Sequence, residues 1–156
     1  MEGGNRKGEV GRRKGEEGRR GGEDRMEGED TESGVLRPVN LMKNSDLRER
    51  TKKFALQIIQ LASKMPRTRE ADIIAKQVVK SGTSVGANYR EASRARSKAE
   101  FSAKIGVVEQ EADESLYWLE IIRECGWIAE KLVRDLIKEA DELVAIFTTI
   151  GKKSKK

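Results

Sequence analysis

The sequence predicts an all-α protein: an antiparallel up-and-down four-helix bundle that follows a disordered N-terminal segment. From Ser45 onward, apolar residues recur with a period of about 3.6 residues, and no alternating, strand-like run of any length occurs. The periodic segments are of comparable length and are joined by short connections, which is typical of antiparallel helical neighbours. We therefore expect a low-complexity leader over residues 1–44 and a helical bundle over residues 45–156.

The leader is built almost wholly from Gly, Glu, Arg, Lys and Asp. Residues 1–34 carry 8 basic and 10 acidic side chains, and such a segment cannot bury enough apolar surface to offset the entropy of ordering its backbone. Its interspersed acids and its lack of aromatic residues argue against an RNA-binding tail. All five residue types can be encoded by purine-rich codons. Such a composition would arise if an untranslated ribosome-binding leader upstream of the gene were read as protein, so we hypothesise that translation naturally starts at Met42.

The first helix is expected to begin at the cap Ser45 and to end before Pro66, because the residue preceding a proline is pushed out of the helical region. Ala55, Ile59 and Ala62 are expected to widen its apolar stripe. The centre of that stripe comprises Leu47, Phe54, Ile58, Leu61 and Met65.

The second helix is expected from about Glu70 to about Arg94. Ser97 and Glu100 then form a capping box, which predicts the start of a third helix, and Gly126 is its C-terminal stop. The apolar stripe of the second helix comprises Ile74, Val78, Ser81, Val85, Tyr89 and Ala92. That of the third comprises Phe101, Ile105, Val108, Ala112, Leu116, Leu119 and Ile122.

The fourth helix is expected from about Ala129 to about Ile150. The sequence ends in KKSKK, which is predicted to form a basic tail too short to fold. The apolar stripe of the fourth helix comprises Leu132, Leu136, Ala140, Leu143, Phe147 and Ile150.

Two glycines interrupt the second helix in the stretch SGTSVGANYREASRARSKAEF. A nucleoside-triphosphate loop needs GxxxxGK followed by Ser or Thr after a strand, whereas Gly82 and Gly86 are separated by three residues, and Ala87 stands where the lysine is needed. Glycines four residues apart share one helix face, where the missing side chains let another helix approach closely. We therefore assign both glycines to close helix packing, within the bundle or between subunits.

Tyr117 and Trp118 are the neighbouring aromatic residues of the third helix. Trp118 lies off the centre of the apolar stripe, where it either widens the core or fills a subunit contact. Because Trp and Tyr are common interface anchors, both residues join Gly82 and Gly86 as candidates for helix packing or an oligomer interface.

Histidine is absent from the whole sequence, which excludes Ser-His-Asp and Cys-His catalysis and histidine metal sites. The lone Cys125 can form no internal disulfide and is expected to be a small buried side chain. No catalytic residue, cofactor or metal site is predicted, and hence no enzyme. No apolar run approaches the roughly 18 residues of a membrane span, so we expect a soluble, cytoplasmic protein.

Positive charge is concentrated in the later part of the chain, because residues 35–156 carry 24 basic and 17 acidic side chains, a net charge of +7. The candidate nucleic-acid-binding residues are Arg90, Arg94, Arg96, Lys98, Lys104, Lys152, Lys153, Lys155 and Lys156. A second interpretation is ion pairing, within the chain or between subunits, with an acidic stripe on the third helix, and we favour it for Arg90 and Arg94. That stripe comprises Glu109, Asp113, Glu120 and Glu124. For the other cations both interpretations stay open.

These motifs resemble a known family. The stretch that contains both glycines, followed by KIGVVEQEADESLYWLEII, is similar to bacterial four-helix-bundle proteins associated with intervening sequences in large-subunit ribosomal RNA. The same broad family includes the accessory variability proteins of diversity-generating retroelements. The resemblance spans roughly residues 54–150 and is specific in the second and third helices. The matching residues are Gln77, Ser81, Ser84, Asn88, Glu91, Ala92, Arg96, Ser97, Phe101, Lys104, Glu111, Glu114, Trp118 and Leu119.

The resemblance implies a four-helix bundle that assembles as a homopentamer, has no enzymatic activity and binds RNA or DNA. For the accessory members it also implies binding to a reverse transcriptase. We therefore expect a non-enzymatic oligomeric adaptor with modest, non-sequence-specific affinity for nucleic acid, accessory to the reverse transcriptase of a diversity-generating retroelement. The alternative is a structural or protein-interaction module with no nucleic-acid role, because fold and function separate easily.

Overall fold

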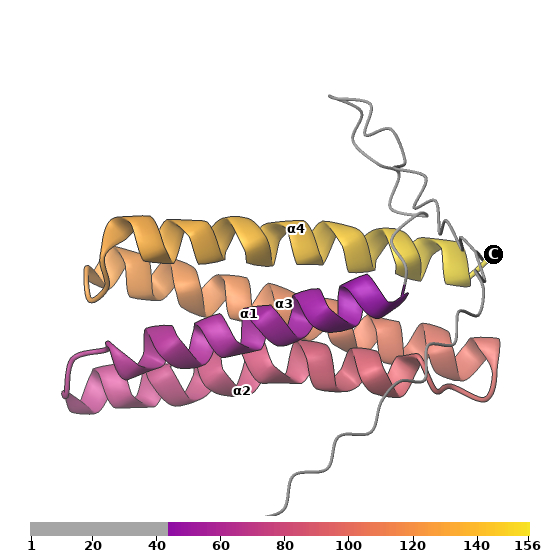
Figure 1. Cartoon of the computed structure of the whole chain (residues 1–156), viewed down its shortest axis with the longest axis horizontal. Coiled ribbons are helices and arrows are strands. Elements are labelled where there is room, and N and C mark those ends of the chain that lie inside the picture. Colours follow the sequence, from indigo (N-terminus) through magenta and orange to yellow (C-terminus); the bar gives the residue numbers. More distant parts are fainter. Residues whose placement is uncertain (1–43) are drawn as a thin grey trace, which may run out of the picture. The chain divides into compact units, whose positions relative to one another are not determined.

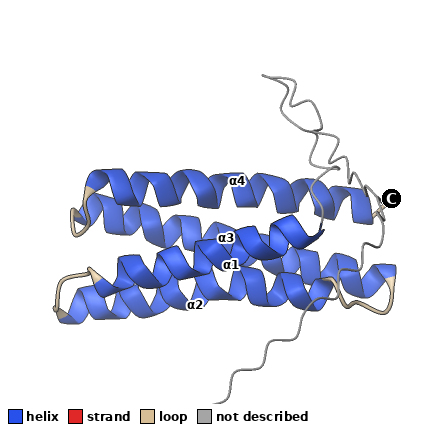
Figure 2. Ribbon diagram, viewed as in Figure 1, coloured by secondary structure: helices blue, strands red, loops and turns tan. Residues whose placement is uncertain are grey.

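The computed structural model describes residues 44–156, which form helices joined by short turns and contain no strand (Figures 1 and 2). The predicted all-α class is thereby confirmed for this part of the chain. The predicted disorder of the leader and the hypothetical start at Met42 lie outside the described residues. The helices are α1 (Asn44–Ser63), α2 (Arg69–Ala92), α3 (Lys98–Cys125) and α4 (Glu130–Ser154).

Each helix packs against the next one in the chain, and α1 also meets α4, which closes an up-and-down bundle. The start of α1, the α2–α3 turn and the end of α4 consequently lie at the same end of the bundle, at the right of Figure 1. Among the helices of residues 44–156, none has an apolar stretch long enough to cross a membrane.

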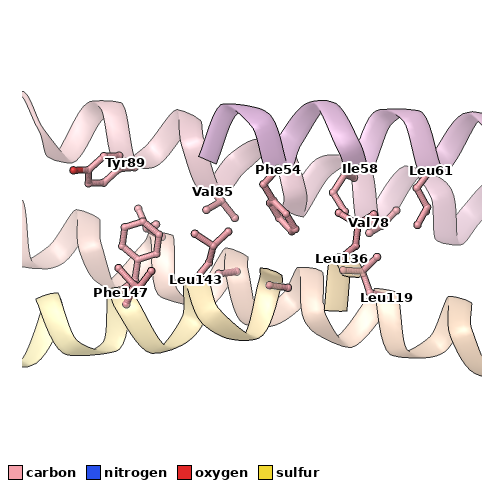
Figure 3. Packing of buried hydrophobic residues seen from close by; sticks show 14 of the residues in the cluster. Phe54, Ile58, Leu61, Val78, Val85, Tyr89, Leu119, Leu136, Leu143 and Phe147 are labelled. Atoms are coloured by element: carbon pink, nitrogen blue, oxygen red, sulfur yellow. The ribbon is translucent and has the colours of Figure 1, made fainter. Parts of the chain in front are cut away.

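The core contains most of the residues that periodicity assigned to it, and Figure 3 shows side chains from all four helices meeting there. Ile59 is an exception: it is 47% exposed, because it lies about 100° around α1 from the buried Ile58. Conversely, Val133 and Ile146 of α4 are buried although the predicted stripe omitted them. The stripe was therefore located correctly, while its edges were not.

The glycines of α2 lie where α1 comes closest. A Cβ atom built on Gly82 would lie 2.9 Å from Cγ1 of Ile58, and one built on Gly86 would lie 3.2 Å from Oγ1 of Thr51. Thr51 is fully buried, and its hydroxyl donates to the carbonyl of Leu47 at 2.7 Å. The absence of two side chains thus lets α1 approach α2 within a single bundle.

The helix boundaries follow local signals. The hydroxyl of Ser97 accepts from the backbone N–H of Glu100 at 3.1 Å, and the Glu100 carboxylate accepts from the backbone N–H of Arg96 at 2.8 Å. Gly126 ends α3 with a φ of 68°, a left-handed conformation that favours glycine. The predicted start and end of α3 are therefore confirmed. Thr68 caps α2 by accepting from the N–H of Ala71, a signal that the sequence analysis had missed.

The predicted KKSKK tail is wrong, because α4 continues through Ser154. The hydroxyl of Ser154 donates to the hydroxyl of Ser102 on α3 at 3.1 Å. Gly151 is buried beside Ile105, so the last turns of α4 pack directly on α3. Lysines in the last turn also interact favourably with the negative end of the helix dipole, which explains why basic residues continue the helix here. At the other boundary, α1 begins at Asn44, one residue before its predicted cap Ser45.

A cluster of charges bridges the seam between α1 and α4. The guanidinium of Arg50 donates to both carboxylate oxygens of Glu139, with its Nε 2.7 Å from Oε1, and to Oε2 of Glu142 at 2.5 Å. The hydrogen bond to Glu139 is the largest cause of a raised Arg50 pKa, which partial burial opposes. These bonds link the first helix to the last, which pack on each other less closely than the helices that follow one another in the chain.

Candidate nucleic-acid interface

The structure places all nine predicted nucleic-acid-binding residues at one end of the bundle. They come from the end of α2, the following turn, the start of α3 and the end of α4. The hydroxyl contact between Ser102 and Ser154 joins the last two of these segments. We call this region, formed by residues 90–104 and 150–156, the basic end.

The net positive charge of the bundle is concentrated at the basic end. It contains nine basic and two acidic side chains, a net charge of +7. The other residues from 44 to 156 contain 13 basic and 15 acidic side chains, a net charge of −2. A field concentrated in this way attracts polyanions to one end of the molecule.

Lys104 of the basic end forms an ion pair. Nζ of Lys104 lies 2.5 Å from Oε2 of Glu91, and both side chains are partly exposed. Among the described residues, no acidic side chain lies within 4 Å of the guanidinium of Arg90 or Arg94. Within the chain, their predicted pairing with the acids of the third helix is therefore wrong.

The acids of α3 have other surroundings. Glu109 faces α4, where its carboxylate accepts a hydrogen bond from the hydroxyl of Thr148 at 2.7 Å. Glu120 and Glu124 lie at the opposite end of the bundle, where they line a depression with Arg123 and Glu130. Glu109 faces the wrong helix, and Glu120 and Glu124 lie at the wrong end of the bundle, to reach Arg90 or Arg94. The linear sequence alone does not show which part of α3 lies beside the end of α2.

A groove between α3 and α4 opens at the basic end. Its volume is about 590 Å³. One wall belongs to the last turns of α4 and carries two lysines, and the other belongs to the first turns of α3 and consists mainly of small residues. The lining residues are Ala99, Ser102, Ala103, Gly106, Glu109, Thr148, Gly151, Lys152 and Lys155. We call it the α3–α4 groove.

Sequence reasoning had missed the α3–α4 groove. A signal was present, because Ala99, Ala103 and Gly106 recur at the spacing of one helix face. That spacing could not reveal which helix lies beside the small residues, so the groove became visible only in the structure.

The aromatic pair lies in the second half of α3, away from the basic end. Tyr117 is 54% exposed, whereas Trp118 is partly buried against the core. Their ring centroids are 4.9 Å apart, and Nε1 of Trp118 donates to Oε1 of Glu114 at 3.2 Å. Trp118 thus widens the core, while Tyr117 lies on the surface.

Cys125 is exposed at the end of α3, so its predicted burial is wrong. It is the last residue of α3 before the stop at Gly126. Across residues 44–156 there is no group of three or more His, Cys, Asp or Glu side chains that could hold a metal ion.

Glu111 is a titratable group that burial perturbs. Desolvation raises its pKa above 4.5, the nearby charge of Glu114 raises it further, and Lys80 lowers it. The folded protein therefore holds this proton at pH values where the unfolded chain has lost it. By linkage, the contribution of Glu111 to stability falls as pH rises above about 4.5.

Replacing Glu111 by glutamine should accordingly raise the melting temperature at pH 7, because the variant desolvates no charge at this position. The advantage should vanish at pH values below 4.5, where the wild-type carboxyl is protonated in both states. Circular dichroism melts at the two pH values measure this effect. The exposed Asp113→Asn is the control, and an equal gain in that variant would show that overall charge, not burial, is responsible.

Comparison with known proteins agrees with this architecture. No curated protein matches the chain. A crystal structure of a protein of unknown function from the S23 ribosomal protein family of Bacteroides thetaiotaomicron is similar, with 31% identity and a TM-score of 0.65; the match covers 71% of this chain and 99% of that one. The profile of the 23S rRNA-intervening sequence protein family matches residues 43–149. The chain therefore belongs to the 23S rRNA-intervening sequence protein family.

Proposed function

We propose that this protein is a non-enzymatic adaptor that binds RNA or DNA through its basic end without reading base sequence. The observation that carries the proposal is the separation of charge: +7 at the basic end and −2 over the rest of the described residues. Phosphates are the groups that such a surface attracts, and neutralising them releases counterions and thereby drives binding.

The residues at the basic end favour contacts to the nucleic-acid backbone. Long cationic side chains at helix ends reach phosphates, which position a duplex but carry no sequence information. Phe101 is the aromatic residue of this region, and it packs partly against the core; Tyr89 and Phe147, which lie just outside the region, are buried. Base stacking, on which many single-strand-binding proteins depend, therefore has no exposed ring among the described residues of the basic end.

The family description names an intervening sequence of 23S rRNA, which makes a structured RNA the first probe. A fluorescein-labelled RNA hairpin should bind in fluorescence anisotropy, with an affinity that falls steeply between about 50 and 200 mM salt. The triple variant R94Q/R96Q/K98Q should bind about tenfold more weakly, and its salt slope should be shallower by about 2–3.

The matched control removes the same charge from the opposite end. The variant R67Q/R69Q/K131Q also loses three cations, all exposed, and should bind nearly as the wild type does. Equal weakening of both variants would contradict a localised interface. An RNA that fails to bind the wild type at low salt would favour the alternative, a structural or protein-interaction module.

Assembly is a further part of the proposal. From the resemblance we infer a cytoplasmic homopentamer that works beside the reverse transcriptase of a diversity-generating retroelement. Large apolar side chains exposed by 47–54% support an interface with other chains, and they are Leu56, Ile59, Ile73 and Tyr117. Light scattering should then give five times the 17.5 kDa mass of one chain, and the protein should co-purify with a reverse transcriptase encoded beside it.

A further inference from the structure

Gly106 has no structural explanation inside the chain. A glycine in the middle of a helix costs about 1 kcal/mol relative to alanine. Gly82 and Gly86 are accounted for by the close approach of α1. A Cβ atom built on Gly106, by contrast, would meet nothing within 4 Å. The space beside this residue is open, so the missing side chain serves no contact within one bundle.

The open space beside Gly106 belongs to the α3–α4 groove. Ala99 and Ala103 continue the same face of α3 toward the basic end, so no long side chain fills the groove from this wall. Lys152 and Lys155 stand on the opposite wall, both exposed. The groove is thus roomy on one side and positively charged on the other.

We propose that the α3–α4 groove seats one sugar–phosphate strand of a bound nucleic acid, with Gly106 leaving room for the strand and the two lysines contacting its phosphates. This inference rests on the proposed function and adds to it the path of the strand. The ammonium groups of Lys152 and Lys155 are the phosphate contacts, because they carry the positive charge of the groove, whereas the hydroxyl of Thr148 already donates to the carboxylate of Glu109.

The spacing of the lysines fits such a strand. Lys152 and Lys155 are three residues apart, which is about 4.5 Å along a helix axis, and their flexible four-carbon stems extend their reach. Lys152 and Lys155 can therefore contact neighbouring phosphates. The charge of the basic end favours this occupant over an uncharged partner helix, which would gain nothing from the lysines.

The carboxylate of Glu109 limits how far the strand can extend along the groove. It lines the groove next to Thr148, one turn beyond Gly106. A phosphate placed there would be repelled, so the occupied part runs from Ala99 to Gly106. The same repulsion predicts that removing the negative charge of Glu109 strengthens RNA binding, whereas filling the groove or removing the lysines weakens it.

The decisive variant is Gly106→Leu, which fills the groove without changing the charge. It should bind the RNA hairpin about tenfold more weakly than the wild type, while its melting temperature is unchanged or higher. Ala87→Leu, at an exposed position of α2, adds the same apolar bulk elsewhere and should leave affinity unchanged. Glu109→Gln should bind about threefold more tightly.

The lysines are tested in the same assay by the full-length double variant K152Q/K155Q. It should lose about tenfold in affinity, and its salt slope should be shallower by about 1–2. The variant K131Q/K138Q removes two exposed lysines from the same helix and should bind as the wild type does.

Two results would contradict the proposal that the groove holds a strand, while leaving the proposed function intact. In the first, Gly106→Leu binds RNA like the wild type although R94Q/R96Q/K98Q is weakened. In the second, Gly106→Leu lowers the mass of the assembly in light scattering and leaves RNA affinity intact. That result would mean that the groove contacts a second copy of the chain. Absence of RNA binding by the wild type would instead remove both proposals together.

Discussion

Replacing Phe147 by alanine should lower the free energy of unfolding by about 3–5 kcal/mol, the usual cost of removing a buried aromatic side chain. Phe147 is fully buried, and its ring centroid lies 5.4 Å from that of Tyr89, with an angle of 54° between the planes (Figure 3). The variant loses both the buried apolar surface and this ring contact, and it leaves a cavity between α2 and α4. Urea denaturation followed by circular dichroism measures the change.

Phe147→Leu is the matched control, because it keeps an apolar side chain of similar volume and should cost only about 1–1.5 kcal/mol. The slope of the unfolding transition should stay constant in both variants, since the amount of surface exposed on unfolding is unchanged. A loss below 1 kcal/mol in Phe147→Ala would show that the ring is not enclosed as the structure places it.

The second large effect is expected at Gly82. A valine there would place its Cβ 2.9 Å from Cγ1 and 3.0 Å from Cγ2 of Ile58, so α1 and α2 must separate or Ile58 must leave its position. Overpacking of this kind costs about 2–3 kcal/mol, which exceeds the few tenths that valine gains over glycine in helix propensity. The same urea titration should show Gly82→Val unfolding at a lower midpoint.

Gly106→Ala provides the comparison for Gly82→Val, because it also adds carbon to a helical glycine but does so in open space. This variant should be more stable than the wild type by up to about 1 kcal/mol. Stabilisation by both substitutions would mean that α1 does not lie against Gly82. Destabilisation by both would mean that α3 also needs its glycine for packing inside the bundle.

Local signals in the sequence predicted the architecture well. The 3.6-residue period located the core of all four helices, because a helix that buries one side must repeat its apolar residues at that interval. Ser97, Glu100 and Gly126 predicted where α3 begins and ends, since capping and the left-handed stop depend on a few neighbouring residues. These features require no knowledge of the rest of the fold.

The errors concern how neighbouring helices meet. Ile59 is exposed and Val133 is buried because the width of the covered face depends on which helix lies alongside. Lys152 and Lys153 continue α4 because Gly151 and Ser154 pack against α3, which no feature of KKSKK itself reveals. The same dependence hid the α3–α4 groove, whose walls belong to segments that are far apart in the chain.

The cluster of Arg50 with Glu139 and Glu142 has a consequence for the order of folding. Most contacts of the bundle join helices that follow one another in the chain, and such local topology permits folding within microseconds to milliseconds. The hydrogen bonds of Arg50 instead join residues 89 and 92 positions apart, so they close the longest loop and should form late. Interactions formed after the folding transition state slow unfolding without speeding folding. The α1–α4 seam should therefore set how long the folded state persists, while the three helical hairpins set how quickly it is reached.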